Sequence, residues 1–281
     1  MDDGILIRRH GSSGPVVIAL HGGPAAAGSA APIARGLSGA FRVLEPWQRA
    51  SSAEPLTVAR HVADLHEVVL TADSGVAPAL VGESWGAMLA LAYAAAHPAH
   101  AGPLVLVGCG TFDTAARARI GEILEERTDD ALRQRLQELS REFSDPWERL
   151  AKRYELIRHL YSYDPIEEDA DDVPPLDVTA HRETWDDMLR LQKEGVYPAA
   201  FAAITSPVIM LHGAYDPHPG QMIRDSLVPY IPQIEYQEWE RCGHHPWKER
   251  AIREEFFSTL GDWLMRNTQG PHSTSPDPAA P

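Results

Sequence analysis

Residues 79–93 read ALVGESWGAMLALAY, and this stretch decides how the rest of the chain can be arranged. A short apolar run breaks at Gly-Glu-Ser-Trp-Gly, residues 82–86, and apolar residues then return at helical spacing. A buried strand, Gly-x-Ser-x-Gly and a helix together are typical of a nucleophile elbow, in which glycines make room for a strained serine. A helix that begins at Trp85 would direct its N-terminal amides toward Ser84. Because Gly-x-Ser-x-Gly also occurs by chance in glycine-rich connections, this interpretation depends on the surrounding sequence.

The composition indicates one large α/β domain with room for an insertion. The chain has 281 residues, of which 44% are hydrophobic and 23% charged. No apolar run approaches the roughly 20 residues of a membrane span, and the N-terminus lacks the basic start and apolar middle of a signal peptide. The formal net charge of −15 argues against nucleic acid and anionic membranes as partners. We expect a cytoplasmic protein that acts on a small-molecule or short-peptide substrate.

Strand-like and helix-like segments alternate along most of the chain. Continuous aliphatic runs at 16–20 and 104–107 indicate strands that are buried on both faces of a sheet. An amphipathic pattern at 57–70 indicates a helix between them. The alternation predicts the α/β class, with a mostly parallel central sheet flanked by helices. The other expected elements of the core are strands at 5–9, 41–44, 207–211 and 234–239 and helices at 221–230 and 247–266.

The character of the sequence changes after residue 110, where charged helical patterns replace the β-branched runs. We predict that residues 111–205 form an all-helical cap, inserted into a core of residues 1–110 and 206–268. The Pro-, Ser- and Thr-rich residues 267–281 are expected to be a disordered tail. Within the cap, helices are expected at 115–127, 131–143, 147–161 and 181–194, with an acidic solvated loop at 167–172.

Three chemically reactive residue types each follow the end of a predicted strand. Ser84, Asp216 and His244 occupy these positions, in the order Ser, Asp, His along the chain. Ligands of an open parallel sheet bind at the carboxyl ends of its strands, so we expect the three side chains to meet there. Three independent placements that agree are much less frequent by chance than one motif.

Two motifs give the core a resemblance to the α/β-hydrolase fold with a cap domain. The sequences HGGP at 21–24 and GESWG at 82–86 are similar to the HGGP and GxSWG motifs of proline iminopeptidases. The resemblance covers roughly residues 16–110 and 206–266 and implies a catalytic triad and an oxyanion hole. Proline iminopeptidases continue the first motif with a glycine, whereas this chain has Ala25.

The residue types also fit acyl transfer on chemical grounds. A serine hydroxyl is a weak nucleophile near neutrality, so Ser84 needs a base, and we assign that role to His244. Asp216 would orient the imidazole and stabilise its charged form. The backbone NH groups of Gly23 and Trp85 would bind the oxyanion of the tetrahedral intermediate.

Some of these residues have a plainer interpretation. Asp216 could be an ordinary turn aspartate, and His245 is the nearest rival of His244. Pro246 restricts residue 245 to extended backbone, which favours His244 as the base. Glu83 is interpreted as a structural residue beside the elbow.

No metal, nucleotide or other cofactor is predicted. The histidines show no metal-ligand spacing such as His-Glu-x-x-His, and no Gly-x-Gly-x-x-Gly follows a strand. Cys109 and Cys242 are expected to follow two strands that flank the strand ending near His212. Two strand spacings are too wide for a disulfide without distortion, so both cysteines are expected to be buried thiols.

The leading hypothesis is a serine hydrolase that cleaves an ester or amide bond of a small molecule through an acyl-enzyme on Ser84. A prolyl aminopeptidase is the more specific alternative, and it would need carboxylates from the cap to bind a free α-amino group. Carbon–carbon bond hydrolases, lactonases, transferases and a ligand-binding module without turnover remain open, because the fold does not choose among them. The candidate substrate-binding residues are Glu125, Glu126, Trp147 and Trp185, and Glu183 is a further candidate carboxylate. An apolar pocket could be lined by cap residues whose helical spacing fits packing within the cap better, namely Trp147, Tyr154, Tyr161, Trp185 and Met188.

Overall fold

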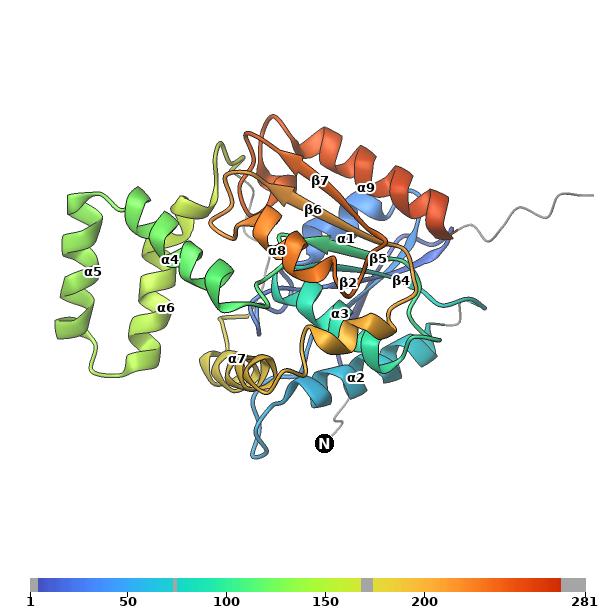
Figure 1. Ribbon diagram of the computed structural model, residues 1–281, viewed down its shortest axis with the longest axis horizontal. Helices are drawn as coiled ribbons and strands as arrows, with labels where there is room; N and C mark the ends of the chain where they lie inside the picture. The colour runs from blue at the N-terminus through green and yellow to red at the C-terminus, as the bar shows by residue number, and fades with distance from the viewer. Residues whose placement is uncertain (1–4, 73–74, 168–173, 269–281) are drawn as a thin grey trace, which may run out of the picture.

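The computed structural model describes residues 5–72, 75–167 and 174–268, apart from the side chain of Trp147. Within these residues a seven-stranded sheet has the order β1-β3-β2-β4-β5-β6-β7 (Figure 1). One edge strand is antiparallel to its neighbour, and the other neighbouring strands are parallel. This confirms the predicted α/β architecture. The strands are β1 (Ile7–His10), β2 (Val16–Leu20), β3 (Arg42–Pro46), β4 (Ala79–Glu83), β5 (Leu104–Val107), β6 (Val208–Gly213) and β7 (Ile234–Trp239).

Helices cover both faces of the sheet, because the residues of β2, β4, β5 and β6 are buried throughout. One face packs against α2 (Val58–Thr71), α3 (Trp85–Ala96) and α8 (Gly220–Leu227). The other packs against α1 (Ala31–Leu37) and α9 (Arg253–Thr268). None of the described helices is both long and apolar enough to cross a membrane.

Two of these helices differ from the sequence prediction. Helix α1 was not predicted, because its seven residues APIARGL are too few and too small to show an apolar period. The closing helix α9 begins at Arg253 rather than at residue 247, since the chain first makes a short 3-10 turn, η3 (Pro246–Lys248). Helix α9 also includes residues 267 and 268, which the prediction gave to the tail, and the rest of the predicted tail lies outside the described residues.

Residues 111–205, the predicted insertion that we call the cap, contain helices that lie beyond the carboxyl ends of the strands (Figure 1). Aspartates cap three of them at the N-terminus, since the carboxylates of Asp113, Asp129 and Asp177 accept a backbone N–H three residues later. Residues 168–173, which include most of the predicted acidic loop, lie outside the described residues. The cap elements are α4 (Thr114–Arg127), α5 (Asp130–Glu142), α6 (Pro146–Ile157), η1 (Arg158–Tyr161), α7 (Val178–Lys193) and η2 (Ala199–Ala203).

The register of the sheet sets where functional groups can meet. Glu83 at the end of β4 pairs with Val107 at the end of β5, and Val107 pairs with Leu211 near the end of β6. Gly213 at the end of β6 pairs in turn with Trp239 at the end of β7. The carboxyl ends of these parallel strands are therefore level, and the loops that follow them share one edge of the sheet.

Candidate active site

Ser84 lies in the turn between β4 and α3 with φ of 52° and ψ of −115°. Residues with a side chain rarely adopt a positive φ, so this turn holds strained backbone. The Ser84 amide donates to the carbonyl of Val107 over 2.8 Å, and its carbonyl accepts from the amide of Ala87 over 3.1 Å. A Cβ at Gly86 would lie 2.3 Å from the carbonyl oxygen of Leu20, so α3 can begin this close to β2 only with glycine there.

Asp216 and His244 lie on the loops that follow β6 and β7, and both are buried. The His244 Nδ1 lies 2.6 Å from the Asp216 Oδ2. Because an ionised carboxylate only accepts hydrogen bonds, Nδ1 carries the proton and Nε2 is the basic nitrogen of the ring. His245, the alternative base, instead has its Nδ1 3.6 Å from the Glu83 Oε2.

Two further histidines, which the sequence analysis did not single out, surround the same carboxylate. The Oδ1 of Asp216 accepts from the backbone amide of His218 over 2.9 Å and lies 3.0 Å from the His218 Nδ1. The His212 Nε2 lies 3.2 Å from the Asp216 Oδ2. One nitrogen each from His218 and His244 and one oxygen of Asp216 lie within 4.8 Å of one another, but hydrogen bonds already join them.

The electrostatics of this cluster keep Asp216 ionised and make His244 more basic. Burial alone would raise the pKa of Asp216, but the charges of His244, His218 and His212 hold it well below its usual range. Burial alone would lower the pKa of His244, but the charge and the hydrogen bond of Asp216 outweigh it and raise the pKa above 6.5. Asp216 therefore stays ionised and stabilises the protonated form of His244.

Ser84 and His244 both line a cavity of about 250 Å³. Gly22, Gly23 and Glu83 from the core also line it. The cap contributes a set of lining residues that is mostly apolar and includes one imidazole. These residues are Leu150, Ala151, Tyr154, Leu176, Val178 and His181.

Glu83 holds the loop after β2 beside the elbow. Its Oε1 accepts from the amide of Gly22 over 3.1 Å and from the hydroxyl of Ser29. Gly23, with φ of 114°, follows in a conformation that favours glycine and lines the cavity with Ser84. Trp85 is the first residue of α3, where a backbone amide has no partner within the helix. The hydrogen bonds from Gly22 and Ser29 to the buried carboxylate of Glu83 fit its interpretation as a structural residue.

Gln48, a residue that the sequence analysis missed, links the histidine turn to the elbow helix. Its Oε1 accepts from the Trp85 indole over 2.7 Å, and its backbone amide donates to the His21 Nε2 over 2.9 Å. Burial lowers the pKa of His21 to about 4, so the ring is neutral and can accept this bond. No pattern around Gln48 marks it in the sequence, because it lies in an irregular loop.

The structure does not bring the predicted cap carboxylates into the cavity. Glu125 is exposed and lies 3.0 Å from the Arg133 guanidinium, and Glu126 is exposed and lies 2.9 Å from Arg119. The Glu183 Oε2 accepts from the backbone amide of Leu56 over 2.9 Å. Both glutamates of α4 are exposed, pair with arginines and do not line the cavity that holds Ser84, contrary to the expectation that they contact substrate.

The predicted cap aromatics lie in different environments, although the rings of Tyr154 and Tyr161 are neighbours with centroids 6.1 Å apart. Trp185 is half-buried and packs against the apolar cluster around α3, and Tyr154 lines the cavity. Tyr161 instead stands edge-on to His244, with ring centroids 5.7 Å apart, and its carbonyl accepts from the His244 amide. The side chain of Trp147 lies outside the described residues.

A buried carboxylate joins the cap to the loop that carries His244. Glu249 accepts from the backbone amides of Tyr163, Asp164 and Gly243 over 2.7 to 3.0 Å. No pattern in the sequence marks this role, since the burial of one glutamate among many cannot be inferred from composition. Glu249 thereby fixes the loop that carries His244 relative to the cap.

Comparison with known proteins places this geometry in context. Residues 17–254 match the alpha/beta hydrolase family. Structures with a similar fold include a putative aryl esterase from Burkholderia cenocepacia (18% identity, 94% of both chains, TM-score 0.67). A thermophilic esterase from Thermogutta terrifontis also has a similar fold (18% identity, 94% of both chains, TM-score 0.61). A proline iminopeptidase from Mycobacterium smegmatis has a similar fold as well (16% identity, 93% of this chain and 94% of that chain, TM-score 0.64). No curated protein sequence matches the chain.

Proposed function

Because the chain belongs to the alpha/beta hydrolase family and is a hydrolase, we propose that it cleaves carboxylic esters of small apolar molecules through an acyl-enzyme on Ser84. The observation that carries the proposal is the shared cavity, which Ser84 and His244 line together with mostly apolar cap residues. The hydrogen bond between His244 and Asp216 supplies the orientation that a general base needs.

The proposed reaction has two steps. In the first, His244 Nε2 takes the hydroxyl proton of Ser84 while Oγ attacks the ester carbonyl, and the protonated imidazole then delivers that proton to the leaving alcohol. In the second, His244 takes a proton from water as the water oxygen attacks the acyl carbonyl, and the protonated imidazole then returns that proton to the Ser84 Oγ as the bond to the acyl group breaks and the carboxylic acid leaves. The amides of Gly23 and Trp85 bind the oxyanion in both steps, and one such donor typically contributes about 10²–10³ in rate.

The lining of the cavity favours a neutral apolar substrate over a peptide with a free amino terminus. An ammonium group buried in the cavity would need an available carboxylate. Glu83 is the lining carboxylate, and one of its oxygens already accepts from the Gly22 amide and the Ser29 hydroxyl. Lys248 also lines the cavity and would repel an ammonium group.

Hydrolysis of p-nitrophenyl acetate, butyrate and octanoate, measured beside L-proline p-nitroanilide, tests the proposal. The wild-type chain should hydrolyse at least one ester with a kcat/KM well above that for the anilide. The Ser84→Ala variant should lose this activity while it keeps the wild-type thermal midpoint. A higher kcat/KM for the anilide would favour an aminopeptidase, and ester hydrolysis that survives Ser84→Ala would contradict the acyl-enzyme.

A further inference from the structure

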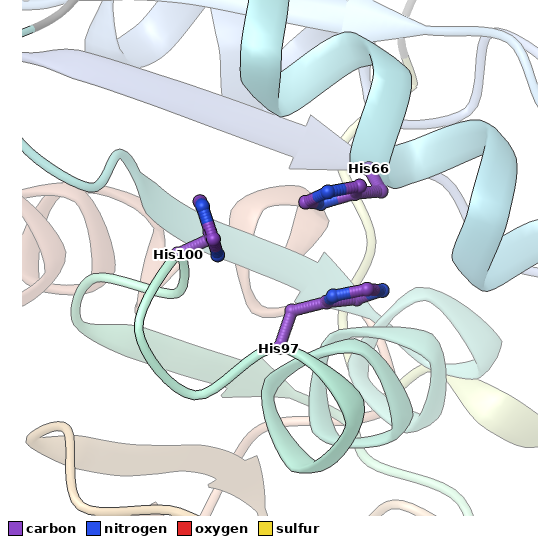
Figure 2. A group of neighbouring side chains, drawn as sticks. All are labelled: His66, His97 and His100. Carbon is purple, nitrogen blue, oxygen red and sulfur yellow. The ribbon is translucent and has the colours of Figure 1, made fainter.

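Three histidines gather at the end of α3 that lies opposite Ser84 (Figure 2). His66 comes from α2, His97 caps the C-terminus of α3, and His100 comes from the loop that follows. Helix α3 has 12 residues, so about 18 Å of helix separates this group from Ser84. The histidine group is therefore distinct from the candidate active site.

The three imidazole rings lie close together, but their nitrogens do not all point toward one common position. The rings of His66 and His97 stack with centroids 4.0 Å apart and planes 5° apart, and His100 stands edge-on to both (Figure 2). One ring nitrogen of each lies within 4.8 Å of the other two. His66 and His97 are half-buried and His100 is exposed, so an ion from solvent can reach the group.

Two features of the surroundings favour a cation. The Nδ1 of His66 lies 3.1 Å from the phenol oxygen of Tyr93, and in the tautomer in which Nδ1 donates its proton to this oxygen the lone pair of Nε2 is free for a metal ion. Metal-binding histidines usually have such a partner on their other nitrogen. His97 lies at the C-terminus of α3, where the last carbonyls of the helix carry partial negative charge.

We propose that His66, His97 and His100 bind one late divalent transition-metal ion, of which Zn²⁺ is the probe of choice. Imidazole nitrogens suit Zn²⁺, Cu²⁺ and Ni²⁺. A tetrahedral Zn²⁺ with Zn–N distances of about 2.1 Å needs nitrogens roughly 3.4 Å apart. The parallel rings of His66 and His97 must turn apart for their in-plane lone pairs to meet, and nitrogens that now lie within 4.8 Å of one another must approach by at most about 1.4 Å. The bound ion links α2 to the end of α3 and takes no part in acyl transfer.

Calorimetric titration of the full chain with Zn²⁺, without a polyhistidine tag, tests this site. Wild type should bind one equivalent, and His97→Ala and His100→Ala should each weaken binding at least tenfold. His159→Ala is the matched control, since it removes an exposed histidine of η1 outside the group. His244→Ala separates this site from adventitious binding at the candidate catalytic histidine and should leave the affinity unchanged.

Thermal unfolding supplies the second readout. Zn²⁺ at about 100 times its Kd should raise the wild-type Tm by roughly 5 °C relative to the chelated protein, and this rise should vanish in His97→Ala. Unfolding without metal confirms that each variant is folded. The proposal is overturned if wild type binds no Zn²⁺, if His97→Ala and His100→Ala bind it as wild type does, or if His244→Ala abolishes binding.

Discussion

The helix of the elbow, α3, buries most of its side chains, whereas α5, a helix of the outer cap, exposes most of its own. Ten of the twelve residues of α3 are buried, whereas of the thirteen residues of α5 Leu139 is buried. The surface of α5 carries exposed ion pairs such as Arg135 with Glu142, and pairs of this kind contribute little to stability. The candidate catalytic serine therefore lies beside a closely packed helix, whereas α5 of the cap exposes most of its side chains to solvent. Selectivity is expected to follow the few cap residues that reach the cavity.

The largest expected effect separates two adjacent histidines of the core. His244→Ala should lower kcat at least about 10⁴-fold, because the base is removed. His245→Ala should lower it less than tenfold, since His245 also lines the cavity but its Nδ1 has no hydrogen-bond partner among the described residues. Steady-state ester hydrolysis measures both. If His245→Ala were the more damaging change, the assignment of the base would be wrong.

Asp216→Asn should lower kcat by about 10⁴-fold and also shift the pH profile. A base must be neutral, so wild-type kcat/KM should fall as the pH drops through the His244 pKa, which Asp216 raises above 6.5. Asparagine has no charge, so burial would then lower that pKa and the midpoint should move to lower pH. The pH dependence of kcat/KM for both proteins checks this. An unchanged or higher midpoint would contradict the role of Asp216.

One substitution made in both regions should change stability with opposite sign. At Gly86 an added Cβ would meet the carbonyl oxygens of Leu20 and His21 at 2.3 and 2.8 Å, so Gly86→Ala should cost about 3 kcal/mol. At Gly121, inside α4, an added Cβ meets no atom within 4 Å, so Gly121→Ala should add about 1 kcal/mol. Urea unfolding gives both free energies. Equal signs would show that the two regions do not differ in packing as described.

The smallest expected effects distinguish the inner from the outer face of the cap. Tyr154→Ala enlarges the cavity and should change the kcat/KM ratio of octanoate to acetate esters by about tenfold. Glu126→Gln removes a charge that faces Arg119 outside the cavity and should leave that ratio within twofold. Kinetics on both esters measure the contrast. A larger effect of Glu126→Gln would indicate that Glu126 of α4 acts on substrate binding after all.

Much of the core could be predicted because strands buried on both faces carry unbroken aliphatic runs. The predicted strands at 16–20 and 104–107 coincide with β2 and β5. Helix α1 was not predicted, because its seven residues are too few and too small to show a helical period of apolar residues. The rule that ligands bind at the carboxyl ends of parallel strands then directed attention to Ser84, Asp216 and His244.

The cavity wall of the cap could not be predicted in the same way. Helical periodicity indicates which face of a helix is apolar, but it does not indicate which neighbour that face meets. Leu150 and Leu176 line the cavity, whereas Glu125 and Glu126 point to arginines outside it. The buried contacts of Glu83 and Glu249 depend on backbone amides distant in sequence, so they are visible only in the folded chain.

Intact-mass spectrometry after reaction with a fluorophosphonate tests the acyl-enzyme claim most directly. Attack by the Ser84 Oγ on phosphorus would expel fluoride and leave one phosphonyl group on the protein. We predict one adduct on the folded wild-type chain, located on the peptide that contains Ser84, and none on Ser84→Ala. A folded wild-type chain that hydrolyses esters without forming the adduct, or an adduct that persists in Ser84→Ala, would contradict the account.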